Sequence, residues 1–253
     1  MHLRHKPRFR PQDRNRIRPT RNCPARIRPP NPPPESQTLR GRRRTGILRA
    51  SLIAHCQRCC MTPTLATRQT TPHVSAATLL AALPQVLAAP KTDAPVTMLC
   101  FRPAANQRQF PQTLRLTRAE GIPGDRWRTA PWLRLPDGAP DPRIQVSILP
   151  ARVLDLVWCD RTGTPHPGDP IIADLDCSAA NLPDGTLLQA GTAVLRVSSE
   201  FNDGCVKWKL RYGQAARDWI TAPGHPALRL RGILCAVEQD GQVAVGDRLH
   251  VLR

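Results

Sequence analysis

The feature that most constrains the fold is a series of short apolar segments after Asp93, separated from one another by turns of Gly, Pro and Asp. Short apolar or alternating segments bounded by such residues are typical of β-strands. Many short strands joined by regular turns indicate a closed or nearly closed barrel, although periodicity alone also fits other small β-rich domains. We predict a mainly β barrel with strands at residues 96–101, 113–117, 144–148, 171–175, 193–198, 230–237 and 248–252.

A few short helices are predicted beside these strands. Residues 151–157 and 214–220 are expected to be helical. Between residues 74 and 87, apolar side chains recur at steps of three and four, and Ser75 is suited to cap the start. This segment is either a short amphipathic helix or a linker that packs on the barrel. Pro84 weakens the helical pattern.

Positive charge is concentrated at the start of the chain. Residues 1–60 contribute +14 of the net charge of +18, from 16 Lys and Arg against 2 Asp and Glu. Their prolines oppose regular structure, and their apolar surface is too small to offset the entropy of ordering, so we predict a disordered basic extension. Such a segment could be a nucleic-acid-binding or membrane-surface arm, or a mitochondrial transit peptide. We favour a simpler interpretation, in which it is upstream translation and the native protein starts at Met61.

Cysteine usage and hydropathy indicate the compartment. The 9 cysteines are odd in number and scattered, which favours free thiols in a reducing cytoplasm over a disulfide framework. No stretch approaches the roughly 20 apolar residues of a membrane span. We therefore expect a cytoplasmic protein with an extension at 1–60, a helical linker at 61–92 and a barrel domain at 93–253.

Six short segments add a resemblance to this pattern. They are Gly-Ile-Pro-Gly-Asp-Arg-Trp at 121–127, Ile-Gln-Val-Ser at 144–147, Asp-Leu-Asp at 174–176 with Asn-Leu-Pro at 181–183, Gly-Cys-Val-Lys at 204–207, Arg-Leu-Arg-Gly at 229–232, and Val-Gly-Asp-Arg-Leu at 245–249. In their order and approximate spacing they resemble a stand-alone bacterial MOSC domain. That family is similar in fold to the C-terminal domain of molybdenum cofactor sulfurases and to the cofactor domain of amidoxime-reducing enzymes.

The resemblance implies a function as well as a β-barrel. It implies binding of the molybdenum cofactor and a cysteine, here Cys205, that either ligates molybdenum or carries sulfur. The expected activity is sulfur transfer or molybdenum-dependent reduction, with a cysteine desulfurase or a redox protein as partner. Pyridoxal phosphate belongs to the full-length sulfurases, whose aminotransferase domain this chain lacks, and is not expected.

The residues after Cys205 suit this chemistry. Lys207, Lys209 and Arg211 follow it at alternate positions, and on a strand all four side chains would share one face. Nearby cations favour the thiolate, the form that ligates metals, and attract a phosphate. From the residues alone, a solvated basic edge strand beside a buried structural cysteine is the alternative.

Four further residues are predicted to contact the cofactor on the basis of the resemblance. Asp125 and Arg126 would orient a basic group and bind an anion, or simply stabilise their turn. Asn181 would meet a pterin edge or hold its own loop. Arg231 would reach the phosphate or be an ordinary surface residue. Of the remaining candidates, Cys100 and Cys235 are predicted to be core and His166 to be solvated.

One departure from the family pattern bears on activity. Related bacterial sequences often carry His-Thr-Gly-Cys where this chain has Asn202, Asp203, Gly204 and Cys205. Asn cannot transfer a proton, and the Asp203 charge opposes a thiolate next to it. A non-catalytic cofactor carrier therefore stays open as an alternative to an enzyme, as does nucleic-acid binding through residues 1–60.

Overall fold

The computed structural model describes residues 73–252. The expectations for the basic extension at 1–60, and for the first part of the linker, lie outside these residues. The first described helix, α1 (Ala76–Leu87), confirms the helix expected after residue 74. Ser75 caps it, because its hydroxyl accepts the Thr78 N–H at 3.1 Å.

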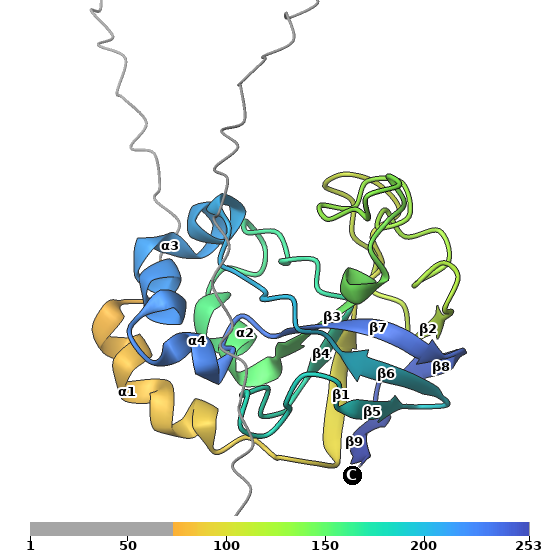
Figure 1. Cartoon of the computed structure of the whole chain (residues 1–253). Helices are drawn as coiled ribbons and strands as arrows, with labels where there is room; N and C mark the ends of the chain where they lie inside the picture. The colour runs from red at the N-terminus through yellow and green to blue at the C-terminus, as the bar shows by residue number, and fades with distance from the viewer. Residues whose placement is uncertain (1–72, 253) are drawn as a thin grey trace, which may run out of the picture. The chain divides into compact units, whose positions relative to one another are not determined.

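The strands after α1 close into a barrel (Figure 1). In order around it they are β1 (Ala94–Leu99), β4 (Ile171–Ala173), β3 (Val146–Pro150), β7 (Ile233–Gln239), β6 (Ala193–Val197), β5 (Leu187–Ala190) and β9 (Arg248–Leu252). Pairing of β9 with β1 closes the ring, and only β3 and β4 run parallel among these described pairs. The predicted barrel is confirmed.

Two strands were missing from the sequence prediction. One is β5, and the other is β8 (Gly241–Ala244), which pairs with β2 (Thr113–Leu116) in a separate two-stranded sheet. The strand expected to start at Ile144 instead begins with a 3-10 turn, η1 (Pro142–Ile144), and continues as β3. Both missed strands are short, with few apolar residues to reveal an alternating pattern.

The helices show one agreement and one error. Helix α2 (Ala151–Val157) has the predicted bounds, and a short α4 (His225–Leu228) follows α3. Helix α3 (Val206–Thr221) starts well before the predicted 214–220 and is kinked at Gly213, whose φ is 91°. The alternative of a solvated basic edge strand beside a buried cysteine is therefore wrong, because the residues after Cys205 are helical and Cys205 is exposed. Trp208 and Tyr212, four residues apart, are both buried on one helical face.

Apolar side chains form cores on both sides of the β3–β4 pair. Ile148 and Ile171 point into the barrel, whereas Leu149 and Ile172 point outward and pack with residues of α1, α2 and α3. These helices gather on that flank (Figure 1). Covering both faces explains why residues 148–150 of β3 and 171–173 of β4 are continuously apolar. Within residues 73–252, none of the helices has the length and apolar character needed to cross a membrane.

Candidate functional site

A cavity of about 610 Å³ lies over the outer face of β3 and β7. Its floor includes Ser147 and Leu234, which are direct cross-strand partners. Their neighbours Val146 and Cys235 point into the barrel instead, as the alternation of a strand requires. The start of α3 and several loops form the rest of the lining. The loop residues that line the cavity fall within 102–108, 126–132, 167–169 and 201–205, and Arg231 lies in the turn before β7.

The cavity is strongly cationic. Six basic side chains line it, and they are Arg102, Arg108, Arg126, Lys207, Arg211 and Arg231. The two acidic residues in the lining are Asp169 and Asp203. Trp132 and Phe201, which are 66% and 48% exposed, supply aromatic surface to the same lining. A cavity of this composition suits an anionic ligand with a flat apolar part.

The Gly-rich loop at 121–127 places Arg126 and Trp127 in the cavity lining. Gly121 and Gly124 have φ values of 65° and 78°, which glycine adopts at little cost. The loop is held by Asp125, whose buried carboxylate accepts hydrogen bonds from the Arg102 guanidinium at 2.7 and 3.0 Å and from the Trp127 N–H at 2.8 Å. Asp125 does not belong to the described lining, and its hydrogen bonds position Arg102 and Trp127, which do.

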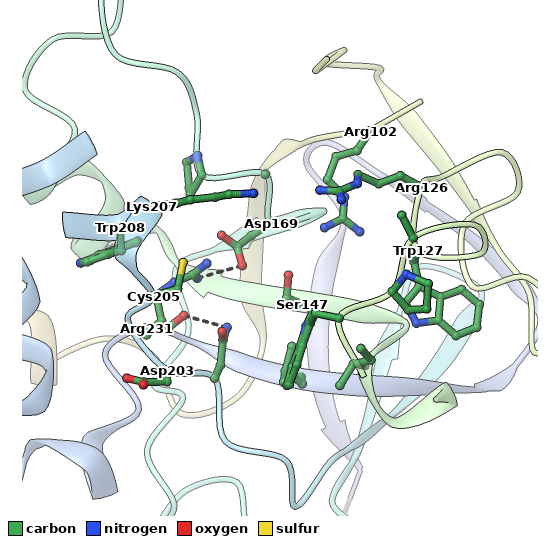
Figure 2. Close-up of a pocket in the computed structure, with 18 of the residues that line it drawn as sticks. Arg102, Arg126, Trp127, Ser147, Asp169, Asp203, Cys205, Lys207, Trp208 and Arg231 are labelled. Carbon is green, nitrogen blue, oxygen red and sulfur yellow. Dashed lines mark hydrogen bonds and ion pairs between the residues drawn. The ribbon is translucent and has the colours of Figure 1, made fainter. Parts of the chain in front are cut away.

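Cys205 stands at the opposite wall. It is the residue that precedes the first turn of α3, and its carbonyl oxygen accepts the Trp208 N–H at 2.9 Å. Its side chain is exposed and lines the cavity. Figure 2 shows Cys205 and Lys207 on one side, Arg126 and Trp127 on the other, and Asp169 between them.

The helical geometry changes which cations accompany the thiol. Lys207 and Arg211, four residues apart, lie on one face of α3 and both line the cavity. Lys209 is exposed and does not belong to the described lining. The alternate positions that a strand would have placed together are thus separated by the helix.

Arg231 is fixed by three contacts at the base of the cavity. Its Nη1 lies 2.9 Å from Oδ1 of Asp169, and its guanidinium lies 4.7 Å above the centre of the Trp208 ring. The Nδ2 of Asn202 donates to the Arg231 carbonyl oxygen at 3.1 Å. The structure therefore brings Arg231 to the same cavity as Cys205, as the sequence predicted.

Asn181 is placed elsewhere. Its Nδ2 donates to the carbonyl oxygens of Lys91 at 2.9 Å and Asp176 at 2.8 Å, and it does not line the described cavity. These contacts fit the alternative in which Asn181 holds its own loop.

His166 corrects a second sequence expectation. It is 2% exposed, not solvated, and lies edge-on to the rings of Phe110 and Trp158. Its Nδ1 accepts the Gly168 N–H at 3.1 Å, which makes Nε2 the protonated nitrogen of the neutral ring. The Pro-Gly turn suggested exposure, because a local sequence pattern does not show that the rings of Phe110 and Trp158 pack on His166 in the folded chain.

Stability should fall in mild acid because of His166. Burial lowers its pKa to about 4, whereas an unfolded histidine has a pKa of about 6.5. Between these values the unfolded chain binds a proton that the folded chain does not, so we expect a loss on the order of 3 kcal/mol as pH drops from about 6.5 to about 4. Urea unfolding across this range measures it. His166→Gln, which keeps an acceptor for Gly168, should lose most of this dependence, and an unchanged pH profile would contradict the assignment.

The other cysteines of the described chain differ from Cys205. Burial raises the pKa of Cys100 and of Cys235 to about 12 and also raises the pKa of Cys177. The prediction that Cys100 and Cys235 are core is confirmed. Cys159 is exposed but does not line the cavity. Cys205 is thus the exposed thiol that faces the cations.

Sequence reasoning missed several residues of the cavity. Arg102, Arg108 and Asp169 follow apolar strands or turns, and nothing local distinguishes them from surface charges. Asp169 ends the His-Pro-Gly-Asp turn, which the sequence marked only as a turn. Their burial and pairing depend on loops that meet only in the folded chain.

Comparison with known proteins finds only distant structural similarity. No protein-family model and no curated protein matches this chain. Among solved structures, YuaD from Bacillus subtilis is 23% identical with a TM-score of 0.42, covering 62% of this chain and 94% of that one. YiiM from Escherichia coli is 16% identical with a TM-score of 0.42, covering 64% and 70%. At these scores neither protein indicates a function for this chain.

Proposed function

We propose that this chain is a MOSC-like domain that binds the molybdenum cofactor, or a sulfurated precursor of it, with Cys205 as the sulfur ligand. The observation that carries the proposal is an exposed thiol in a cavity lined by six cations and several aromatic rings. A soft thiolate suits molybdenum, and the cations suit a phosphate. One thiolate is a single ligand, so it fits a metal that arrives with organic ligands of its own.

Unsatisfied donors support the fit of this group. The Nε atoms of Arg126 and Arg231 and the Nε1 of Trp127 are buried and have no hydrogen-bond partner within the described residues. Such atoms are costly to leave unpaired. All three residues line the cavity, so an anionic ligand with several acceptor oxygens would satisfy them after small side-chain adjustments.

The residues of this chain would divide the task between them. Cys205 would hold the metal or a transferable sulfur, and Lys207 and Arg211 would balance the negative charge of a phosphate. Arg231, paired with Asp169, would present its guanidinium to the ligand from the base of the cavity. When bound, the cofactor would supply a redox-active metal. A sulfur-donating desulfurase or an electron-donating protein would then be the partner.

A cofactor carrier without turnover is the second candidate, and Asn202 favours it. Asn202 stands where related sequences often have a histidine, and its amide is used to hold the Arg231 carbonyl oxygen. An amide has no proton to transfer near neutral pH. The position therefore braces the cavity, which binding requires and proton transfer does not.

The test is to purify the full chain from a host that makes the cofactor and to measure its molybdenum and pterin content. We expect both in comparable amounts. Lys207→Gln and Lys209→Gln remove the same charge from neighbouring sites on one helix, but only Lys207 lines the cavity. We expect Lys207→Gln to weaken retention by about two- to fivefold, as for an exposed ion pair. Equal losses in both variants would show that overall charge, and not this cavity, retains the ligand.

A further inference from the structure

Asp169 has a buried carboxylate whose two oxygens differ in their hydrogen bonding. Its side chain is 2% exposed, and Oδ1 accepts from Nη1 of Arg231 at 2.9 Å. Its second oxygen, Oδ2, is buried with no hydrogen-bond partner within the described residues. The residue lines the cavity, and Figure 2 shows it between the wall that carries Cys205 and the wall that carries Arg126.

The carboxylate is ionised at neutral pH despite its position. Burial opposes ionisation, but the charge of Arg231 and its hydrogen bond to Oδ1 hold the pKa of Asp169 below its usual value. An ionised carboxylate is an acceptor only. Each unused acceptor in a buried place carries a desolvation cost that a donor would remove.

We propose that Asp169 selects the ligands of this cavity by accepting, on Oδ2, a hydrogen bond from an N–H or O–H group of the ligand. This inference rests on the proposed function only in taking the cavity as a ligand site. It adds a requirement that the cations do not impose, because six basic side chains supply donors and attract any anion. A hydrogen-bond acceptor among these cations favours anions that also carry a hydrogen-bond donor over anions that carry none.

The structure defines the class of ligand that satisfies both demands. An anionic group would meet the cations, and a flat ring would meet Trp132 and Phe201. A donor on that ring would reach the floor where Asp169 lies. A site built to pair with a donor rejects analogues that lack it, because its own polar group is then left unpaired. Entry requires a small side-chain adjustment at the floor, of the kind common in binding sites.

Small phosphates provide the probes. Phenyl phosphate carries the anion and the ring, and the 2-, 3- and 4-aminophenyl phosphates add a neutral amino donor at three positions. Calorimetry on the full chain, prepared in a host that cannot make the cofactor, measures each dissociation constant. We expect at least one amino isomer to bind about tenfold or more tightly than phenyl phosphate, as expected for a hydrogen bond to a charged group.

Two variants assign the preference to its residue. Asp169→Asn keeps an acceptor for Arg231 and places an amide N–H₂ where Oδ2 was, so the preference for the amino isomer should disappear. Asp203→Asn removes the same charge from an exposed residue of the same cavity and should keep the preference. Circular dichroism and thermal melting check the folding of each variant.

The outcomes separate this inference from the proposed function. If wild-type protein binds all four phosphates equally, or if Asp169→Asn keeps the preference, the inference is wrong while the cavity stands as an anion site. If no phosphate binds at all, the anion site and the inference fail together. The wild-type comparison decides these points even if Asp169→Asn does not fold.

Discussion

Cys205→Ser should fold normally and lose its bound molybdenum. The side chain is exposed and occupies the N-cap position of α3 without capping it, so the substitution removes no core contact, and a serine hydroxyl there should stabilise the helix by about 0.5–2 kcal/mol. A serine hydroxyl is a harder and less acidic ligand than a thiol, and it holds molybdenum poorly. Metal analysis of protein from a host that makes the cofactor measures the loss, which we expect to be nearly complete.

Two other cysteines provide controls for this result. Cys159→Ser changes an exposed thiol outside the cavity lining and should keep the metal. Cys235→Ser places a hydroxyl in the barrel core and should lose stability whether or not metal is bound. Iodoacetamide should label Cys205 faster in cofactor-free protein than in loaded protein, because exposure of the thiolate sets the rate. Full metal content in Cys205→Ser would contradict the thiolate-ligand proposal and leave the cations as the means of binding.

Gly232→Ala should be among the most destabilising single changes in the barrel. Gly232 joins Arg231 to β7 with a φ of 86°, and a Cβ there would lie 2.1 Å from the Ile148 carbonyl oxygen of β3. Backbone atoms within a ladder cannot retreat as a flexible side chain can. The left-handed conformation costs about 1–2 kcal/mol for other residues, and overpacking costs a further 1–3 kcal/mol, so we expect a total of about 2–5 kcal/mol.

Gly185 separates the two causes. Its φ is 85°, but an added Cβ would have nothing within 4 Å. Gly185→Ala should therefore cost only the conformational part, about 1–2 kcal/mol. Urea unfolding of both variants gives the difference. Equal losses would mean that the approach of Gly232 to β3 is not tight in solution. A backbone shift at Gly232 would also displace the neighbouring Arg231. Anion binding should therefore weaken in Gly232→Ala and not in Gly185→Ala.

Local pattern was sufficient for most of the barrel. Strands β4 and β7 consist mainly of apolar residues, and helix α2 has matching bounds in sequence and structure. The burial of Cys100 and Cys235 followed from apolar neighbours along each strand. These features depend on residues a few positions apart, which periodicity records. The resemblance at 121–127, 204–207 and 229–232 likewise marked three segments that line the cavity.

Tertiary structure decided what local pattern left ambiguous. The alternating Lys207, Lys209 and Arg211 have the period of a strand, but burial of Trp208 and Tyr212 on one face makes the segment a helix. A helix places Lys207 and Arg211 at the cavity and turns Lys209 away. The stabilisation comes from the core that α3 shares with α1 and α2, and a local window does not contain those elements.

The sequence by itself determined the barrel, the burial of Cys100 and Cys235 and the choice of Cys205 as the thiol to examine. The tertiary structure alone decided that Asp125 and Asn181 hold loops, that His166 is buried and that Asp169 pairs with Arg231. A charged or polar residue looks the same in sequence whether it is solvated or paired. Its role depends on which distant loops remove water from it, because burial sets the cost of each unpaired group and only the complete fold sets burial.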